Sequence, residues 1–154
     1  MTDSPSIRYR KSTDPKEALM LLPMLESIEK CYPNFRRWYL SKVIPGIMKG
    51  TGTLIVAEQM DSVVGVAVGK HDGGERKIRC LRVDPRARNN GIGAGLLDRM
   101  MKELGTDFPL ITVSEEMLHG LSRILVNTFR YNLTSVEKGL YRPEKLEYIF
   151  NGNH

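Results

Sequence analysis

A glycine-rich segment between a β-branched run and an amphipathic run is the feature that most constrains how this chain folds. Its sequence is Val83-Asp84-Pro85-Arg86-Ala87-Arg88-Asn89-Asn90-Gly91-Ile92-Gly93-Ala94-Gly95, and a helix is predicted from Gly91 to about Leu104. The first turn of a helix leaves backbone N–H groups without partners and carries partial positive charge. Glycines at 91 and 93 let an anion approach those groups, and Arg86 and Arg88 add charge beside them. The segment therefore predicts a pyrophosphate cradle.

Two better-known phosphate loops do not match this segment. A P-loop requires a Lys-Ser/Thr pair after its second glycine, but Ala94 and Gly95 follow Gly93. A Rossmann fingerprint spaces its glycines as G-x-G-x-x-G directly after a strand, whereas these glycines fall at 91, 93 and 95 after a polar loop. The cradle therefore belongs to neither class.

Hydrophobic periodicity predicts strands and helices on both sides of the segment. Asp14 and Pro15 are the expected N-cap and first residue of a first helix, and Pro33 ends it. We expect a second helix over Phe35–Lys49, interrupted near Pro45. The predicted strands are Ile7–Lys11, Thr53–Glu58, Val63–Lys70, Arg76–Val83, Leu110–Val113, Tyr131–Lys138 and Leu146–Phe150, with a further helix over Ser114–Asn127. Strands that meet in hairpins, with helices between them, indicate an α/β fold of the mixed-sheet α+β type.

Length and composition are those of an ordinary soluble globular protein. The 154 residues correspond to a single domain, residues 1–154, and 41% hydrophobic with 27% charged positions exclude wholesale disorder. No apolar run approaches the roughly 20 residues of a membrane helix, and residues 1–11 lack the apolar part of a secretory signal. Cys31 and Cys80 are too few for a disulfide framework and lack metal-ligand spacing. We therefore expect a cytoplasmic protein with neither a metal nor a membrane partner.

Positive charge is concentrated around the glycine-rich segment. The chain carries a net charge of +5, and residues 76–102 hold eight basic side chains against two acidic ones. Basic residues spread along the whole chain would indicate nucleic acid. A single basic stretch indicates a local anionic ligand instead.

The segment and its flanks closely resemble the acyl-CoA-binding motif of the GCN5-related N-acetyltransferase (GNAT) superfamily. The core of that motif, Q/R-x-x-G-x-G/A, is matched by Arg88, Gly91 and Gly93, and the preceding Leu-x-Val and Asp-Pro also match. The order of predicted elements resembles the family from Ile7 to Phe150. The resemblance implies a GNAT-like acyl-CoA N-acyltransferase fold, in which helices flank a mostly antiparallel central sheet with splayed central strands.

The resemblance also implies acetyl-CoA as co-substrate. Strand backbone would bind its pantetheine arm and helix N–H groups its pyrophosphate. The implied contacts are Leu81, Arg82, Val83, Arg88, Asn89, Asn90, Gly91, Ile92, Gly93 and Ala94. The acetyl group would lie where the motif strand and Leu110–Val113 splay apart, open to direct attack by a neutral amine.

The catalytic residues that are usual in the family are absent at the matching positions. The usual Tyr is replaced by Ile124, an Asn by Met117 and a basic Glu by Lys77. Tyr141, in the turn of the last hairpin, and Tyr32, between the first two helices, are candidate catalytic substitutes. For each of them a purely packing role is the simpler interpretation.

Other polar side chains receive structural interpretations. Cys80 is interpreted as buried packing, because direct transfer needs no nucleophile. Ser114 is interpreted as a helix N-cap. Arg76, Lys77 and Arg79 are either solvated strand residues or contacts to the cofactor's phosphates.

Three functions remain open from the sequence. The first is an N-acetyltransferase that acts on a primary amine of a small molecule or a protein. The second is a non-catalytic acyl-CoA-binding sensor module, and the third is a toxin that acetylates tRNA or aminoacyl-tRNA. A nucleic acid partner is not favoured, because the phosphates of CoA already account for much of the basic stretch, and a homodimer is compatible with the family. The first two helices and the last hairpin present mixed charge, and neither an acidic pocket nor a carboxylate-binding site stands out.

Overall fold

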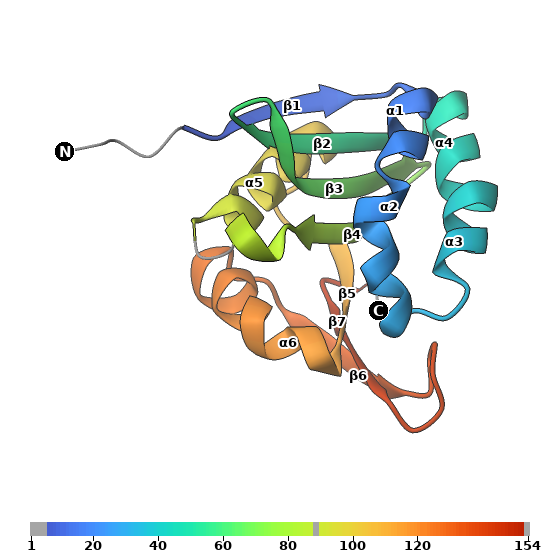
Figure 1. Cartoon of the computed structure of the whole chain (residues 1–154). Coiled ribbons are helices and arrows are strands. Elements are labelled where there is room, and N and C mark those ends of the chain that lie inside the picture. Colours follow the sequence, from blue (N-terminus) through green and yellow to red (C-terminus); the bar gives the residue numbers. More distant parts are fainter. Residues whose placement is uncertain (1–5, 88–89, 153–154) are drawn as a thin grey trace.

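A computed structural model describes residues 6–87 and 90–152 of the chain. Within these residues one sheet has the strand order β1-β2-β3-β4-β5-β7-β6 (Figure 1). The strands are β1 (Arg8–Ser12), β2 (Gly52–Gln59), β3 (Ser62–Asp72), β4 (Glu75–Val83), β5 (Leu110–Ser114), β6 (Leu133–Lys138) and β7 (Leu146–Phe150). The α-helices are α1 (Pro15–Met20), α2 (Leu22–Leu25), α3 (Phe35–Trp38), α4 (Ile44–Lys49), α5 (Ile92–Leu104) and α6 (Glu115–Ser122). The remaining helical turns are η1 (Glu26–Lys30), η2 (Tyr39–Val43), η3 (Pro85–Ala87) and η4 (Arg123–Thr128).

The sheet is antiparallel except between β4 and β5. These two strands run parallel and pair only through Lys77 with Leu110 and Ile78 with Ile111. Beyond these pairs β5 continues its ladder with β7, and β4 continues with β3. The expected mostly antiparallel sheet with splayed central strands is therefore confirmed.

Both of the predicted N-terminal helices form, but each is locally distorted. The Asp14 side chain accepts a hydrogen bond of 2.9 Å from the Lys16 N–H, as expected of an N-cap. The run then divides into α1, α2 and η1, because Pro23 has no N–H to continue the α-helical ladder. Residues 35–49 are helical throughout, and the irregularity expected at Pro45 lies earlier, in the wide turn η2. Pro45 cannot donate to the carbonyl four residues before it, so the turn ahead of it opens.

Hydrophobic side chains form two clusters on opposite faces of the sheet. Side chains alternate along β2, so Leu54 and Val56 face α1–α4 whereas Ile55 and Ala57 face α5. Figure 1 shows α1–α4 grouped on one side of the strands and α5 on the other. Helices therefore cover both faces of the central strands.

In the described part of the chain, no helix is long and apolar enough to cross a membrane. The same residues contain no group of three or more histidine, cysteine or acidic side chains placed to hold a metal ion.

Candidate functional site

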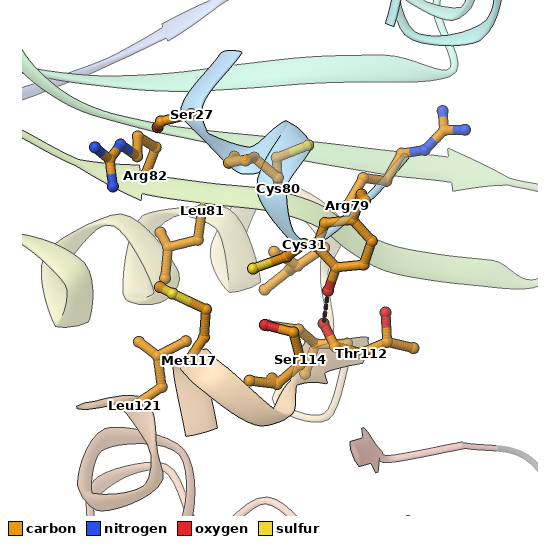
Figure 2. Close-up of a pocket in the computed structure, with 15 residues that line it drawn as sticks. Ser27, Cys31, Arg79, Cys80, Leu81, Arg82, Thr112, Ser114, Met117 and Leu121 are labelled. Carbon is orange, nitrogen blue, oxygen red and sulfur yellow. Dashed lines mark hydrogen bonds between the residues drawn. The ribbon is translucent and has the colours of Figure 1, made fainter. Parts of the chain in front are cut away.

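A cavity lies where β4 and β5 diverge. It has a volume of about 90 Å³ and is called the gap cavity here. Figure 2 shows Leu81 extending from β4 toward Met117 of α6, with Ser114 on the β5 side. The lining residues are Ser27, Ile28, Cys31, Tyr32, Ile78, Arg79, Cys80, Leu81, Arg82, Ile111, Thr112, Val113, Ser114, Met117 and Leu121. Two predicted cofactor contacts, Leu81 and Arg82, thus form part of its wall.

The start of α5 is open around its glycines. Gly91 is the N-cap in a left-handed conformation, with φ of 74°, which favours glycine. A Cβ placed on Gly91 meets no described atom within 4 Å, and one on Gly93 comes no closer than 3.8 Å, to Ile124 Cδ1. The first helical hydrogen bond runs from Gly95 N–H to the Gly91 carbonyl, so the N–H groups of the first turn point out of the helix end. This geometry fits a phosphate group.

Four of the other predicted contacts differ in what they can offer a ligand. Ile92 has a fully buried side chain, so only its backbone can face a ligand. The Asn90 side chain donates to the Ala87 carbonyl at 3.1 Å and shapes the loop before the helix. Arg88 and Asn89 lie outside the described residues.

Two further glycines let the start of α5 pack closely on the sheet. A Cβ on Gly65 of β3 would lie 2.9 Å from both Ile92 Cγ2 and Leu96 Cδ1. A Cβ on Gly95 would lie 2.0 Å from the Tyr9 hydroxyl. Real carbon atoms do not approach this closely, so these two glycines set where the helix start lies. Gly95 therefore serves packing against β1.

A second, larger cavity of about 360 Å³ adjoins the gap cavity. The two cavities share the wall residues Ile28, Tyr32, Arg79, Cys80 and Thr112. The other wall residues of the larger cavity are Pro33, Asn34, Phe35, Arg37, Trp38, Ser41, Lys42, Lys77 and Tyr141. Because four of its lining side chains are basic, we call it the basic cavity.

The two predicted catalytic tyrosines lie together beside these cavities. The rings of Tyr32 and Tyr141 meet edge to face, with centroids 5.3 Å apart. Tyr32 lines both cavities, whereas Tyr141, which is 42% exposed, lines only the basic cavity. The Tyr32 hydroxyl donates toward Glu147 Oε2 at 3.3 Å and the Thr112 carbonyl at 3.5 Å. Burial and the nearby Glu147 raise the pKa of Tyr32.

Glu147 is a buried carboxylate behind Tyr32. It stands on β7 opposite Ser114 of β5 and is only 1% exposed. Within the described residues its Oε1 atom is buried without a hydrogen-bond partner. Burial raises the pKa of Glu147 more strongly than the hydrogen bond from Tyr32 lowers it. Such a carboxylate accepts a proton more readily than a solvated one.

The turn of the last hairpin is held against the cavities by Arg142. Its guanidinium lies 2.7 Å from one carboxylate oxygen of Glu116 and donates to the other at 2.8 Å. It also donates to the Lys30 carbonyl at 3.4 Å, which joins the hairpin to η1. The ion pair lowers the pKa of Glu116 to about 2. These contacts position the neighbouring Tyr141 next to Tyr32.

Residues 50–141 match the sequence model of the acetyltransferase (GNAT) domain, which covers more than half of the chain. The chain belongs to the GNAT acetyltransferase family. The splayed strands and the open start of α5 described above are those that the resemblance implied. A comparison of this chain with curated proteins gives no significant match.

Solved structures share the fold of this GNAT domain at low sequence identity. The IAA acetyltransferase of Bacillus cereus is 17% identical, with a TM-score of 0.71 over 94% of this chain and 97% of its own. A Bacillus subtilis acetyltransferase solved with CoA is 14% identical, with a TM-score of 0.69 over the same 94% and 97%. The YncA protein of Salmonella typhimurium, solved with its cofactor acetyl-CoA, is 12% identical, with a TM-score of 0.67 over 96% and 95%.

The three residues that the resemblance aligns with the usual catalytic positions lie in different parts of the site. Ile124 lies beside Gly93 at the start of α5, and Met117 lines the gap cavity. Lys77 lines the basic cavity. None of the three side chains can both donate and accept protons at neutral pH. Proton transfer in this GNAT domain therefore requires other groups.

The structural interpretation of Cys80 agrees with the structure, but that of Ser114 needs correction. Cys80 is buried in a core cluster, and burial raises the pKa of its thiol to about 12, which suppresses the nucleophilic thiolate. Ser114 does occupy the N-cap position of α6, but its hydroxyl makes no capping hydrogen bond. Among the described residues its Oγ atom is buried without a partner, at the wall of the gap cavity. The hydroxyl faces the cavity instead of the helix.

Sequence reasoning missed Glu147 and the convergence of basic side chains. The only available signal for Glu147 is an acidic residue inside the short apolar strand Leu146–Phe150. Its partner Tyr32 lies 115 positions away in the sequence. Arg37 and Lys42 come from the second helical run, whereas Lys77 and Arg79 come from β4. Only the fold brings these groups to one site.

Proposed function

We propose that this GNAT protein is an N-acetyltransferase that transfers the acetyl group of acetyl-CoA to a primary amine by direct attack. The observation that carries the proposal is the divergence of β4 from β5 beside the open start of α5. This arrangement supports the proposal, because the cavity between the strands would take an acyl group and the nearby helix start would take phosphates. The CoA-containing structures of the same fold support it.

The chain's own residues fit acetyl-CoA in two places. The first-turn N–H groups at Gly91–Ala94 would hold the pyrophosphate. The β4 backbone at Leu81 and Val83 lies beyond the last pair with β5 and is where the pantetheine arm would bind. Bound acetyl-CoA would supply a thioester carbonyl for an amine to attack and a thiolate leaving group.

Tyr32 and Glu147 provide a route for the proton that the amine loses. Tyr32 lines both cavities, so an amine in the basic cavity would reach the phenol oxygen at the wall that the two cavities share. It accepts the proton of the attacking nitrogen while its own proton moves to Glu147 Oε2, 3.3 Å away. This proton transfer accompanies the bonding of the neutral amine nitrogen to the acetyl carbon, and the tetrahedral intermediate collapses as the thiolate leaves with the electron pair of the C–S bond. Tyr141 acts as a positioning residue, because its ring packs against Tyr32.

Ligand-dependent stability and thiol release test this function together. At 100 times its dissociation constant, acetyl-CoA adds about 2.7 kcal/mol to the free energy of unfolding. We expect acetyl-CoA and CoA to raise the melting temperature and NAD to leave it unchanged. Gly91→Asp removes the effect by placing a carboxylate at the cradle. Gly105→Asp is the matched control, because Gly105 caps the other end of α5 with a φ of 71° and has equally open surroundings.

An amine panel with acetyl-CoA, monitored by CoA thiol release, then tests turnover. The expected result is amine-dependent release that Gly91→Asp abolishes. Binding of acetyl-CoA without release on any amine would instead indicate a non-catalytic sensor. A melt that neither CoA species shifts would remove the basis of the whole proposal.

A further inference from the structure

The basic cavity is lined by four cations and, among the described residues, by no carboxylate. Arg37 and Lys42 come from α3 and η2, and Lys77 and Arg79 come from β4. Its volume of about 360 Å³ lies in the range of small-molecule sites. A cavity with this charge favours an anionic occupant and disfavours a cationic one.

Two of these cations are held inside the cavity without an anionic partner. Lys77 and Arg79 are both partly buried, and in the described part of the chain neither forms an ion pair. The nearby Glu75 is instead 3.2 Å from Lys70. Burial lowers the pKa of both cations, so an incoming anion would relieve an unfavourable charge.

The aromatic residues of the cavity orient the cations and add an apolar surface. The Arg79 guanidinium lies 4.8 Å from the centroid of the Trp38 ring, a cation–π contact that fixes it at the wall. Tyr32 and Tyr141 form another part of the wall. The cavity therefore offers apolar contact to the body of a ligand and fixed charge to its anionic group.

From this arrangement we propose that the acceptor is a small primary amine that also carries an anionic group, a carboxylate or a phosphate. This inference rests on the proposed acetyltransferase function. The anionic group binds at Lys77 and Arg79, and the amine reaches the shared wall at Tyr32, next to the gap cavity. The same positive charges disfavour an ammonium group and so increase the fraction of the neutral amine that attacks.

Matched pairs of amines test the proposal. Tyrosine and tyramine differ by a carboxylate, O-phosphoethanolamine and ethanolamine differ by a phosphate, and spermidine represents cationic amines. We expect kcat/KM for at least one anionic member to exceed that of its partner by about tenfold or more, because charged hydrogen bonds are strong. The pair that responds identifies the anionic group. Equal or better use of the uncharged members or of spermidine would overturn the proposal.

Variants locate the effect in the basic cavity. Lys77→Gln and Arg79→Gln are expected to lower the anionic-to-uncharged preference about tenfold. Arg76→Gln removes the same charge from an exposed position on β4, outside the cavity, and is expected to keep the preference. A preference that survives in both cavity variants, or falls equally in the control, would refute this location.

Melting temperatures of the wild type with each amine distinguish a failure of the proposed acetyltransferase function from a failure of the proposed acceptor class. If no amine supports thiol release, the proposed function fails. The preference of the basic cavity for an anionic amine is then decided by binding alone: stabilisation by an anionic member and not by its partner supports that preference. Equal shifts, or none with any amine, would contradict it.

Discussion

Replacing Tyr32 with phenylalanine tests the proton route while it preserves the surrounding packing. The ring, and with it the edge-to-face contact with Tyr141, remains. Only the hydroxyl is lost, which donates toward Glu147 Oε2 at 3.3 Å and the Thr112 carbonyl at 3.5 Å. The substitution therefore separates the chemistry of the phenol from its shape.

The expected loss of activity is large compared with the expected loss of stability. A positioned acid–base group contributes at least about 100-fold to the rate, or about 2.7 kcal/mol of activation free energy. Removing the hydroxyl also leaves Oε2 of the buried Glu147 without its donor, at a cost of about 1–3 kcal/mol in unfolding free energy. The melting temperature then falls by about 2–4 °C per kcal/mol, so assays at 25 °C still measure folded protein.

The assay is kcat against pH with saturating acetyl-CoA and amine. In the wild type, kcat rises with pH as Glu147 loses its proton, with an apparent pKa above the ordinary glutamate value. We expect Tyr32→Phe to lose this rise of kcat with pH. Tyr141→Phe keeps the ring packed on Tyr32 and is expected to change kcat by less than about threefold. A Tyr32→Phe enzyme within threefold of the wild type, with the same pH limb, would refute the relay.

Three further predictions concern the framework of the site. Because burial raises the pKa of Glu147 above its unfolded value of about 4.3, the folded state binds the extra proton. Its contribution to stability is therefore lost as pH rises from about 4.3 through the folded pKa. Glu147→Gln is expected to remove this fall. If urea denaturation gives the same dependence of the unfolding free energy on pH, from pH 4 to 8, in the wild type and the variant, the prediction is wrong. Gly65→Ala places a methyl group against Ile92 and Leu96 and is expected to cost about 1–3 kcal/mol by urea denaturation, whereas Gly74→Ala, with open surroundings, costs less. Burial raises the pKa of the Cys80 thiol to about 12, so we expect it to resist alkylation by iodoacetamide at pH 8 in the folded protein and to react in urea. Mass spectrometry of the Cys80 peptide measures the labelling. Rapid labelling of the folded protein would show that this prediction is wrong.

Local features of the sequence determined most of the element order and the phosphate cradle. Asp14 and Pro15 begin a helix because a side-chain acceptor and a fixed φ act on adjacent residues. Gly91 suits the start of α5 because glycine readily takes the left-handed conformation that the backbone has at this N-cap. Such signals act within a few residues and can be read in order along the chain.

Residue roles that depend on contacts between distant parts of the chain could not be predicted from the local sequence. Gly95 belongs to the motif by position, yet Tyr9 of β1 is what requires it. The hydroxyl of Ser114 faces the gap cavity instead of capping α6. In both cases the local pattern is compatible with two roles, and packing selects one.

The candidate chemistry was decided by the tertiary structure. Tyr32 was a candidate from the sequence, but the carboxylate that gives it a proton acceptor stands on β7, 115 residues away. The early basic residues of β4 were compatible with solvent or with cofactor phosphates, and the fold places Lys77 and Arg79 in a cavity with Arg37 and Lys42. Burial and the approach of like charges shift pKa values only after the chain has folded, because both depend on distance in space and not on separation in sequence.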